Sequence, residues 1–300
     1  MSFRNVSEWA QCFDSGRFHV TAFRKQVASA ATAANDFVDY TYFAGNPVAN
    51  FYASSPLESA YVEANRGIFL RDVGKSQFIK DFCTMSAAAS ATSTTNQNQR
   101  LTLCDYLMYY PFIDTDAVGE QRDMVQPVPL PSCCPYGGQI MCVDQSASSP
   151  VATFTLSYTN QDGVAGRTSQ VTYTKAVAGG GILVSSPTNS VAGSLPFVNL
   201  QAGDTGVRSV ESCTFSAAGG GLMAIVIVKP LFHSLNTQEC RRTTTGNLES
   251  YGAATHLESF IHQQTPEVKQ GAVLGVVGLG NAGSLAYSIL TGVLTTQWSA

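Results

Sequence analysis

The sequence predicts a mainly β protein, an antiparallel β-sandwich of the jelly-roll type with an N-terminal extended or mixed arm region. From residue 100 onward, short apolar runs rich in β-branched and aromatic residues recur, turn residues separate nearly all of them, and no helical pattern alternates with them. We therefore expect residues 1–99 to form an arm and mixed segment that packs on the core or projects from it, and residues 100–300 to form the sandwich domain.

A low charge content narrows the class of protein. Charged residues make up 13% of the chain, about half the roughly 25% of an ordinary soluble domain, and uncharged polar residues and Gly take their place. Interface cores are depleted in Lys, Glu and Asp, so this composition favours a subunit of an assembly. The net charge is only -4 and no basic cluster exceeds Arg241-Arg242, so we expect no direct contact with nucleic acid.

The chain opens on a short helical pattern. Trp9, Cys12 and Phe13 fall at helical spacing after Ser7, which can act as an N-cap, so we expect one amphipathic helix over residues 7–13 that packs on the domain. The Ala-rich residues 27–36 suit either a helix or an extended arm, because Ala and Thr favour different structures.

Two loop-like stretches follow in the first part of the chain. Pro47 and Pro56 lack backbone donors, so residues 45–57 should form an extended loop, anchored by Phe51 and Tyr52. The uncharged polar tract 86–99 has no periodicity and indicates an exposed connection.

The strands of the sandwich are expected in six runs. These are residues 101–113, 139–143, 154–159, 170–174, 210–215 and 221–228. In 154–159 apolar residues alternate with Thr and Ser, which is typical of a strand with one buried face, and Asp162-Gly163 suits the turn of the hairpin that follows. The continuously apolar run 222–228 should be the central strand, covered on both faces and ending at Lys229-Pro230.

Aromatic residues supply the candidate interface or anchor positions. The cluster Tyr106, Tyr109, Tyr110 and Phe112 is typical of core packing, with a carbohydrate-binding or receptor-binding surface as the alternative. Six aromatic residues are candidate anchors or contact residues: Trp9, Phe13, Phe51, Tyr52, Tyr109 and Tyr110.

The cysteines indicate thiols and not a disulfide framework. The eight residues are irregularly spaced and the N-terminus has no secretory signal, so we expect synthesis in the cytoplasm with reduced thiols. Cys104, Cys142 and Cys213 lie in apolar runs and should be core residues. Three others could cross-link subunits after cell lysis: Cys12, Cys133 and Cys134.

Three patterns that suggest a ligand or a membrane fail on closer inspection. Gly278, Gly280 and Gly283 have dinucleotide-binding spacing, but only seventeen residues follow and none is acidic. The uncharged segment 272–294 is long enough to span a bilayer, but it is rich in Gly, Ser and Thr and lacks flanking basic residues. The Cys and His residues match no zinc spacing. We expect no cofactor, no metal and no membrane contact.

Nothing in the sequence indicates an enzyme. No Gly-x-Ser-x-Gly motif is present, and the carboxylates are unclustered apart from Asp114 and Asp116, so we expect no catalytic residues. Arg208 should form a local ion pair with Asp204 or Glu211.

Six segments resemble a family of tailed-bacteriophage virion structural proteins. They are residues 9–26, 45–57, 104–114, 157–169, 203–212 and 221–231, with WAQCFDSGRFHVTAFRKQ and GLMAIVIVKPL at the two ends. The resemblance implies a virion protein, made in the bacterial host cytoplasm, and supplies no catalytic residues.

The resemblance and the composition together suggest a role in assembly. The leading hypothesis is a capsid decoration or cement protein that stabilises the head through contacts with other virion proteins and with its own copies as a homo-oligomer. The alternatives are a neck, collar or tail ring component, or a host-receptor or carbohydrate-binding virion module.

Overall fold

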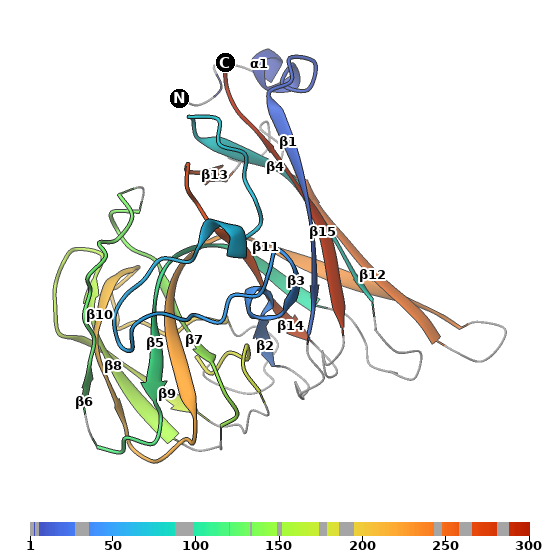
Figure 1. Cartoon of the computed structure of the whole chain (residues 1–300). Helices are drawn as coiled ribbons and strands as arrows, with labels where there is room; N and C mark the ends of the chain where they lie inside the picture. Colours follow the sequence, from blue (N-terminus) through green and yellow to red (C-terminus); the bar gives the residue numbers. More distant parts are fainter. Residues whose placement is uncertain are drawn as a thin grey trace.

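The computed structural model of the chain describes twelve stretches of sequence. They are residues 3, 6–27, 36–87, 99–119, 121–132, 134–148, 152–173, 179–185, 195–242, 248–257, 266–280 and 288–300, with the backbone alone at 87, 152, 173, 235–242, 248–257 and 280. The structure confirms the predicted fold class, because its named strands pair antiparallel in two sheets (Figure 1).

The large sheet has eleven strands and carries most of the core. Its main path is β2 (Phe37–Asp39), β14 (Leu274–Gly280), β5 (Gln99–Asp114), β11 (Leu222–Arg242), β12 (Leu248–Leu257), β4 (Gln77–Ala87), β15 (Ile289–Gln297), β1 (Phe18–Gln26) and β3 (Ala44–Asn46). Off this path, β7 (Gln139–Asp144) pairs with β11, and β13 (Glu267–Val268) pairs with β4.

The small sheet has four strands. Their order is β6 (Gln121–Asp123), β10 (Val207–Phe215), β8 (Ala152–Asn160) and β9 (Arg167–Tyr173). Helical structure is limited to α1 (Val6–Ala10), η1 (Tyr40–Tyr42) and η2 (Ala64–Arg66) among the described residues.

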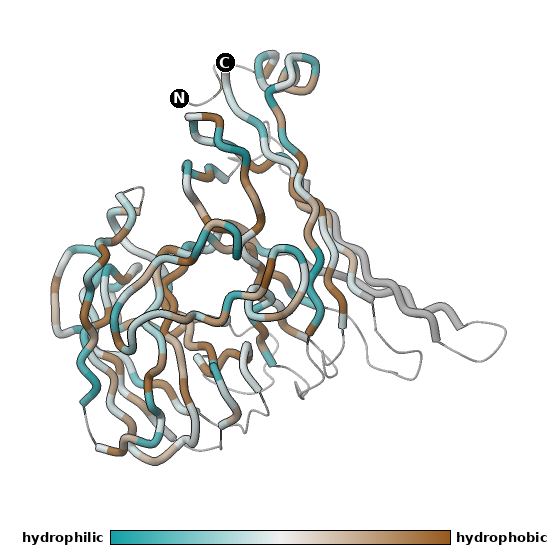
Figure 2. Tube along the Cα trace, in the orientation of Figure 1, coloured by the Kyte–Doolittle hydropathy of each residue, from teal (hydrophilic) through white to brown (hydrophobic). Residues whose placement is uncertain are grey.

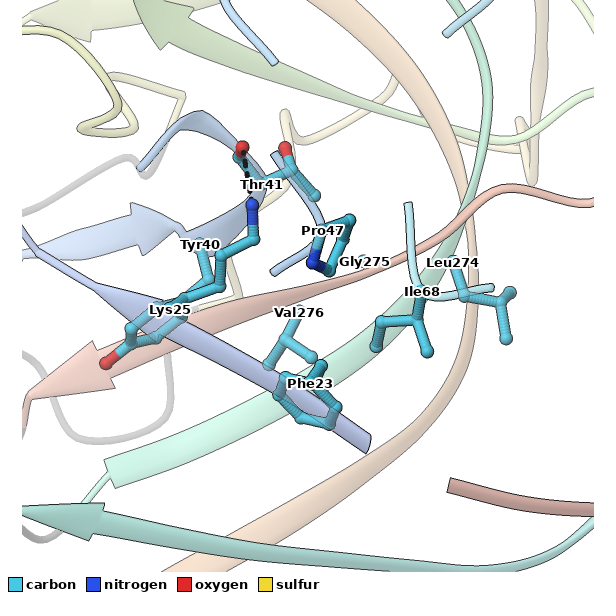
Figure 3. A pocket seen from close by; sticks show the side chains of 9 residues that line it. All are labelled: Phe23, Lys25, Tyr40, Thr41, Pro47, Ile68, Leu274, Gly275 and Val276. Atoms are coloured by element: carbon cyan, nitrogen blue, oxygen red, sulfur yellow. Dashed lines mark hydrogen bonds between the residues drawn. The ribbon is translucent and has the colours of Figure 1, made fainter. Parts of the chain in front are cut away.

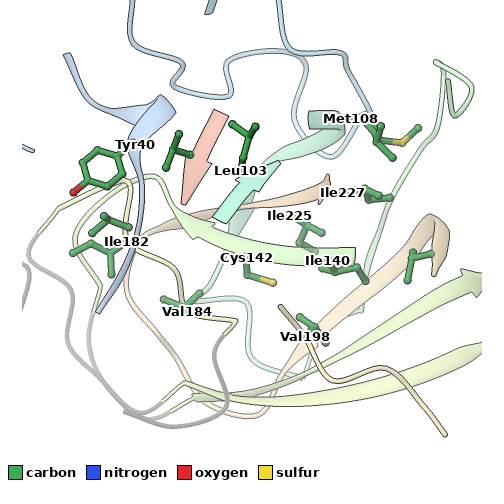
Figure 4. Close-up of a cluster of buried hydrophobic side chains, with 14 of the residues drawn as sticks. Tyr40, Leu103, Met108, Ile140, Cys142, Ile182, Val184, Val198, Ile225 and Ile227 are labelled. Carbon is green, nitrogen blue, oxygen red and sulfur yellow. The ribbon is translucent and has the colours of Figure 1, made fainter. Parts of the chain in front are cut away.

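The central-strand prediction for 222–228 is confirmed. Alternate side chains of this apolar run (Figure 2) enter two different clusters: Met223, Ile225 and Ile227 belong to one, and Ala224, Val226 and Val228 to the other. All six are 0% exposed. The first cluster also holds inward residues of β5, β7 and β8, so it fills the space between the sheets (Figure 4).

The strand does not end at Lys229-Pro230, contrary to the prediction. β11 continues to Arg242, and its register with β5 shifts between Pro230 and Phe232. A proline cannot donate to the ladder, and a bulge is one of the places where a strand tolerates it.

The hairpin prediction in the small sheet is also confirmed. Phe154, Leu156 and Tyr158 are fully buried, while the Thr and Ser residues between them are half-buried. β8 pairs with β9 from Ala152↔Tyr173 to Tyr158↔Arg167. The connection uses Gly163 at φ 82° and Gly166 at φ 72°, a conformation that Gly adopts without steric cost.

Strands from both ends of the chain share the large sheet. β1 pairs with β15 along its whole length, β15 pairs with β4, and β4 pairs with β12. We call the part made of β1, β15 and β4 the wing; it runs up the side of the molecule beside β12 (Figure 1). The expected division of the chain at residue 99 stays a prediction, and the structure adds that β1, β2 and β4 on one side of it pair with strands on the other.

The N-terminal helix is shorter than expected. It ends at Ala10 and turns follow through Gly16, whose φ is 66°. The Ser15 N–H donates to the Gln11 carbonyl at 3.0 Å, so the chain closes one more turn before β1 begins. Most of 27–36 and of 86–99 lies outside the described residues.

The glycine-rich C-terminal stretch forms strands wherever it is described. β14 lies antiparallel between β2 and β5, which differs from the parallel strand and crossover helix of a dinucleotide site. No helix in the described part of the chain has the length and apolar character needed to cross a bilayer.

Candidate functional site

The carboxylate of Asp39, at the end of β2, is fully buried and heavily hydrogen-bonded. The hydroxyls of Tyr52 and Tyr106 donate to it, the latter at 2.7 Å, and so do the Thr41 N–H at 2.9 Å and the Thr41 hydroxyl at 2.7 Å. Asp39 is 0% exposed. Burial raises the pKa of Asp39, against the hydrogen bonds, and burial also raises the pKa values of Tyr52 and Tyr106.

A buried lysine lies beside this network and lines a small apolar pocket (Figure 3). The ammonium of Lys25 donates to the backbone carbonyls of Thr41, Phe43 and Val48 at 3.4, 3.1 and 3.2 Å. Desolvation lowers the pKa of Lys25 to about 8. The rest of the pocket wall is mostly apolar, from Phe23, Ile68, Leu274 and Val276 among others.

These two groups fasten loops to the large sheet. Both carboxylate oxygens of Asp39 already accept hydrogen bonds from its own chain, and no part of the group reaches solvent. A general base needs a free lone pair within reach of a substrate proton, which this geometry does not offer. Asp39 therefore joins η1, the loop at Tyr52 and β5, and Lys25 holds the segment 41–48 on β1.

A second polar group of residues lies on the outer face of the small sheet. A shallow depression there is lined by Gln121, Asp123, Thr155, Ser157, Thr168, Glu211, Ser212 and Thr214. Glu211 accepts from the hydroxyls of Ser157 and Thr159, both at 2.7 Å, and from the Gly166 N–H at 3.1 Å. Partial burial opposes ionisation, but these hydrogen bonds outweigh it and lower the pKa of Glu211.

The prediction that Arg208 forms an ion pair with Asp204 or Glu211 is wrong. Asp204 pairs with Arg167, whose Nε lies 2.9 Å from the carboxylate, and Arg208 Nε donates to the carbonyl of Pro135 at 2.8 Å. The β8–β9 hairpin brings Arg167 to Asp204, a contact between residues far apart in sequence. The Arg167 hydrogen bond lowers the pKa of Asp204 to about 2.

Three of the six candidate anchors are interior residues. Tyr52, Tyr109 and Tyr110 are 0%, 5% and 0% exposed. The Tyr110 hydroxyl accepts from the Val210 N–H at 3.3 Å and so links β5 to β10. Tyr106 is also buried, so the three tyrosines of the cluster offer no aromatic surface for a sugar or receptor, whereas Phe112 is half-buried.

The other three anchors keep accessible surface. Phe51 and Phe13 are 54% and 37% exposed, and Trp9 is half-buried against a cluster of Phe3, Cys12 and Phe78. The ring of Phe13 stacks on Phe18 at 4.2 Å and faces the Lys80 ammonium at 3.7 Å. Whether any of them touches another subunit stays a prediction.

The cysteines proposed for cross-linking are buried where the structure describes them. Cys12 is 0% and Cys134 is 5% exposed, and both are unbridged thiols; Cys133 lies outside the described residues. Burial raises the pKa of the Cys12 thiol, which lowers its reactivity. Cross-linking through them stays a prediction and requires these thiols to become accessible.

Sequence inspection missed three residues that matter for the surfaces and the core: Asp39, Lys25 and the exposed Cys83 on β4. The one signal in the sequence for such residues was a single charged side chain inside an apolar or aromatic run, as in residues 37–42. Within the described ranges, no group of three or more His, Cys, Asp or Glu side chains is placed to hold a metal ion.

Comparisons with known proteins found only weak structural similarity. No family model matches the chain, and no curated protein matches its sequence. Solved structures of the VP2 protein of infectious bursal disease virus are weakly similar. A mutant VP2 from T=1 particles is 9% identical with a TM-score of 0.21 (94% of this chain, 78% of that one), and VP2 of a subviral particle is 8% identical with a TM-score of 0.20 (98% and 86%). TM-scores this low do not establish a shared fold.

Proposed function

We propose that this protein is a structural subunit of a tailed-phage virion and not an enzyme, and that it decorates or cements the capsid through contacts between subunits. Its partners are then other virion proteins and further copies of itself. The resemblance of its segments to phage virion proteins supports the virion assignment.

One observation carries the proposal: a charge-poor protein that exposes large apolar side chains in many places. Only 13% of its residues are charged. Large apolar side chains that are more than half exposed occur on separate loops: Phe51, Phe69, Val125, Tyr136 and Val164. Apolar side chains exposed singly also occur on monomers, so the low charge content carries the argument, because interface cores are depleted in Lys, Glu and Asp.

The non-enzymatic part of the proposal is supported by the state of the buried ionisable groups. Asp39 and Lys25 are fully engaged with their own chain, as described above. Glu211 and Asp204 are held ionised by hydrogen bonds on the small sheet, away from any enclosed apolar cavity. A catalytic acid or base usually has its pKa shifted toward neutrality in a cleft, as burial does for Lys25, but the ammonium of Lys25 donates to three backbone carbonyls of its own chain.

The test is composition and stability of purified particles with and without this protein. Mass spectrometry of particles purified by density gradient should detect the chain in many copies. Particles that lack it should show missing density on the head by electron microscopy, and should release their DNA at a lower temperature. Density at the neck or tail would favour a ring component instead, and absence of the chain from purified particles would contradict the virion role.

A further inference from the structure

The outer face of the wing is open below the N-terminal helix. Along β1 the residues Val20, Ala22 and Arg24 are exposed while Phe23 and Lys25 point inward and are buried. The registers place matching residues of β15 and β4 on the same side of the sheet. We call the following set the open face: Val20, Ala22, Arg24, Asp81, Cys83, Met85, Thr291 and Val293.

The open face is apolar at its centre. Val293 lies in the middle row, between Ala22 and Cys83 on the neighbouring strands, and is 36% exposed. Val20 and Met85 are 48% and 46% exposed. An exposed apolar sheet face of this kind marks a surface that something covers.

Above the open face, the same side of the sheet is already covered. Phe78 and Gln297 pair across β4 and β15 two residues beyond Thr295, and they are 7% and 0% exposed. The cover comes from Cys12, Phe3 and the partly buried Trp9, next to α1. This face is therefore one that packs against other groups, and its lower part has no such cover from the described residues.

The two charges on the open face are complementary and lie at opposite corners. Arg24 belongs to the row of residues Arg24, Thr291 and Met85 that pair across β1, β15 and β4. Asp81 belongs to the row of Val20, Thr295 and Asp81 on the same three strands. They are two strands and four residues apart, roughly 16 Å at ordinary sheet spacings. That distance is too long for an ion pair within one chain. Arg24 is exposed, and Asp81 is half-exposed and accepts from the Thr295 hydroxyl at 3.0 Å.

A second copy of the chain satisfies both charges at once. Consider two copies whose wings face each other. They are related by a two-fold axis that lies between the two sheets, parallel to them, and runs perpendicular to the line from Arg24 to Asp81. It brings Arg24 of each copy opposite Asp81 of the other, and Val293 meets its own counterpart at the centre. Val20 and Met85 then lie close to the axis, and the strands of the two copies cross steeply, as in orthogonal sheet packing.

We propose that the open face is a self-association surface at which two copies of this chain pair through a two-fold axis, with reciprocal Arg24–Asp81 contacts around an apolar centre. The inference deepens the proposed function, on which it rests for its biological meaning, by naming one of the subunit contacts. The physical claim itself concerns the isolated protein.

Charge reversal tests the reciprocal contact. The protein should dimerise in sedimentation equilibrium, and Arg24→Glu or Asp81→Arg should each weaken dimerisation by at least about tenfold, because both pairs become repulsive. An equimolar mixture of the two single variants should dimerise like the wild type, since each contact between unlike variants is again between opposite charges. Restoration on mixing shows that residue 24 of one copy meets residue 81 of the other.

Two further variants keep the test sharp. Lys75→Glu reverses an exposed charge outside the open face and should leave dimerisation unchanged. Val293→Lys brings two like charges together at the centre and should leave a folded monomer by circular dichroism.

The outcomes separate this inference from the proposed function. A wild type that is monomeric throughout, single variants that dimerise normally, or a mixture that stays monomeric would each overturn the self-association surface, even if the protein is found in particles. Dimers that behave as expected, from a protein missing from particles, would support the surface and remove the virion role.

Discussion

The small sheet and the wing each present one face that the rest of the described chain leaves uncovered, but the two faces carry different chemistry. On the small sheet the outer side chains of β8 and β10 are Thr155, Ser157, Glu211 and Thr214, all of them polar, and the Ser157 hydroxyl donates to Glu211. On the wing the equivalent positions hold Val, Ala, Met and Cys at the centre and along the edges, with Arg24, Asp81 and Thr291 among them. A polar face is complete as it stands, whereas an apolar face gains free energy when another surface covers it.

The carboxylates show the same contrast between regions. Asp105 on β5, inside the large sheet, is 5% exposed, and burial raises its pKa to about 6. Glu211, on the outer face of the small sheet, has its pKa lowered by hydroxyl and N–H donors. An ionised carboxylate therefore lowers stability where burial dominates, as at Asp105, and raises stability where hydrogen bonding dominates, as at Glu211.

Thiol labelling should separate the two regions by the largest factor. Cys83 on the wing is exposed, whereas Cys213 on β10 is 0% exposed and reacts only when the sheet opens. We expect Cys83 to react with a maleimide at least about a thousandfold faster, because opening a core strand costs most of the global stability. Peptide mass spectrometry over time gives both rates. Equal rates would mean that the small sheet opens readily, and slower labelling of Cys83 at high protein concentration would support the open face.

Truncation of a core side chain tests which face of the small sheet is buried. Phe154→Ala should lower the free energy of unfolding by about 3–5 kcal/mol, because it leaves a cavity beside Phe215, whose ring lies 5.3 Å away. Thr155→Ala, the next residue on the outer face, is the matched control and should change it by less than about 0.5 kcal/mol. Urea unfolding measures both. Similar losses would show that both faces are packed.

The pH dependence of stability tests the buried carboxylate of the large sheet. Between the unfolded pKa near 3.8 and the folded pKa of about 6, the native state keeps the proton of Asp105 and the unfolded state has lost it. Stability from this group therefore falls as pH rises through that window and stays low above it. Asp105→Asn should reduce the fall by an amount on the order of 3 kcal/mol, measured by urea unfolding from pH 4 to pH 7. An unchanged pH profile would contradict the burial of this carboxylate.

The smallest effect belongs to the outer face of the small sheet. The folded pKa of Glu211 is lowered, so its contribution is present above the unfolded value of 4.5 and is lost as pH falls below it. Glu211→Gln should cost less than about 1 kcal/mol at pH 7, since the group is only partly buried and solvent screens its charge. At pH 3 wild type and variant should converge. A larger loss at pH 7 would indicate that Glu211 is more buried than the structure shows.

Local pattern predicted the strands that have a strong period and missed those that do not. The alternation at 154–159 and the apolar run at 222–228 give β8 and the first part of β11. β1 and β4 mix apolar, polar and charged residues, as in FHVTAFRKQ, because one side faces the core and the other is the partly covered side of the wing. The prediction that the strand ends at Pro230 is wrong, because a strand can continue through a proline at a bulge. Whether a bulge forms depends on the partner strand, which the local sequence does not contain.

The sequence by itself determined the mainly β class, the hairpin at Asp162-Gly163 and the burial of the tyrosines around residue 109, because alternation, turn chemistry and apolar runs act within a few residues. Tertiary structure alone decided that β1 lies against β15, that Arg167 and not Arg208 meets Asp204, and that Asp39 is enclosed by Tyr52 and Tyr106. Each of these contacts joins residues far apart in the chain. Their free energy comes from packing and desolvation in the assembled sheets, to which a local pattern has no access.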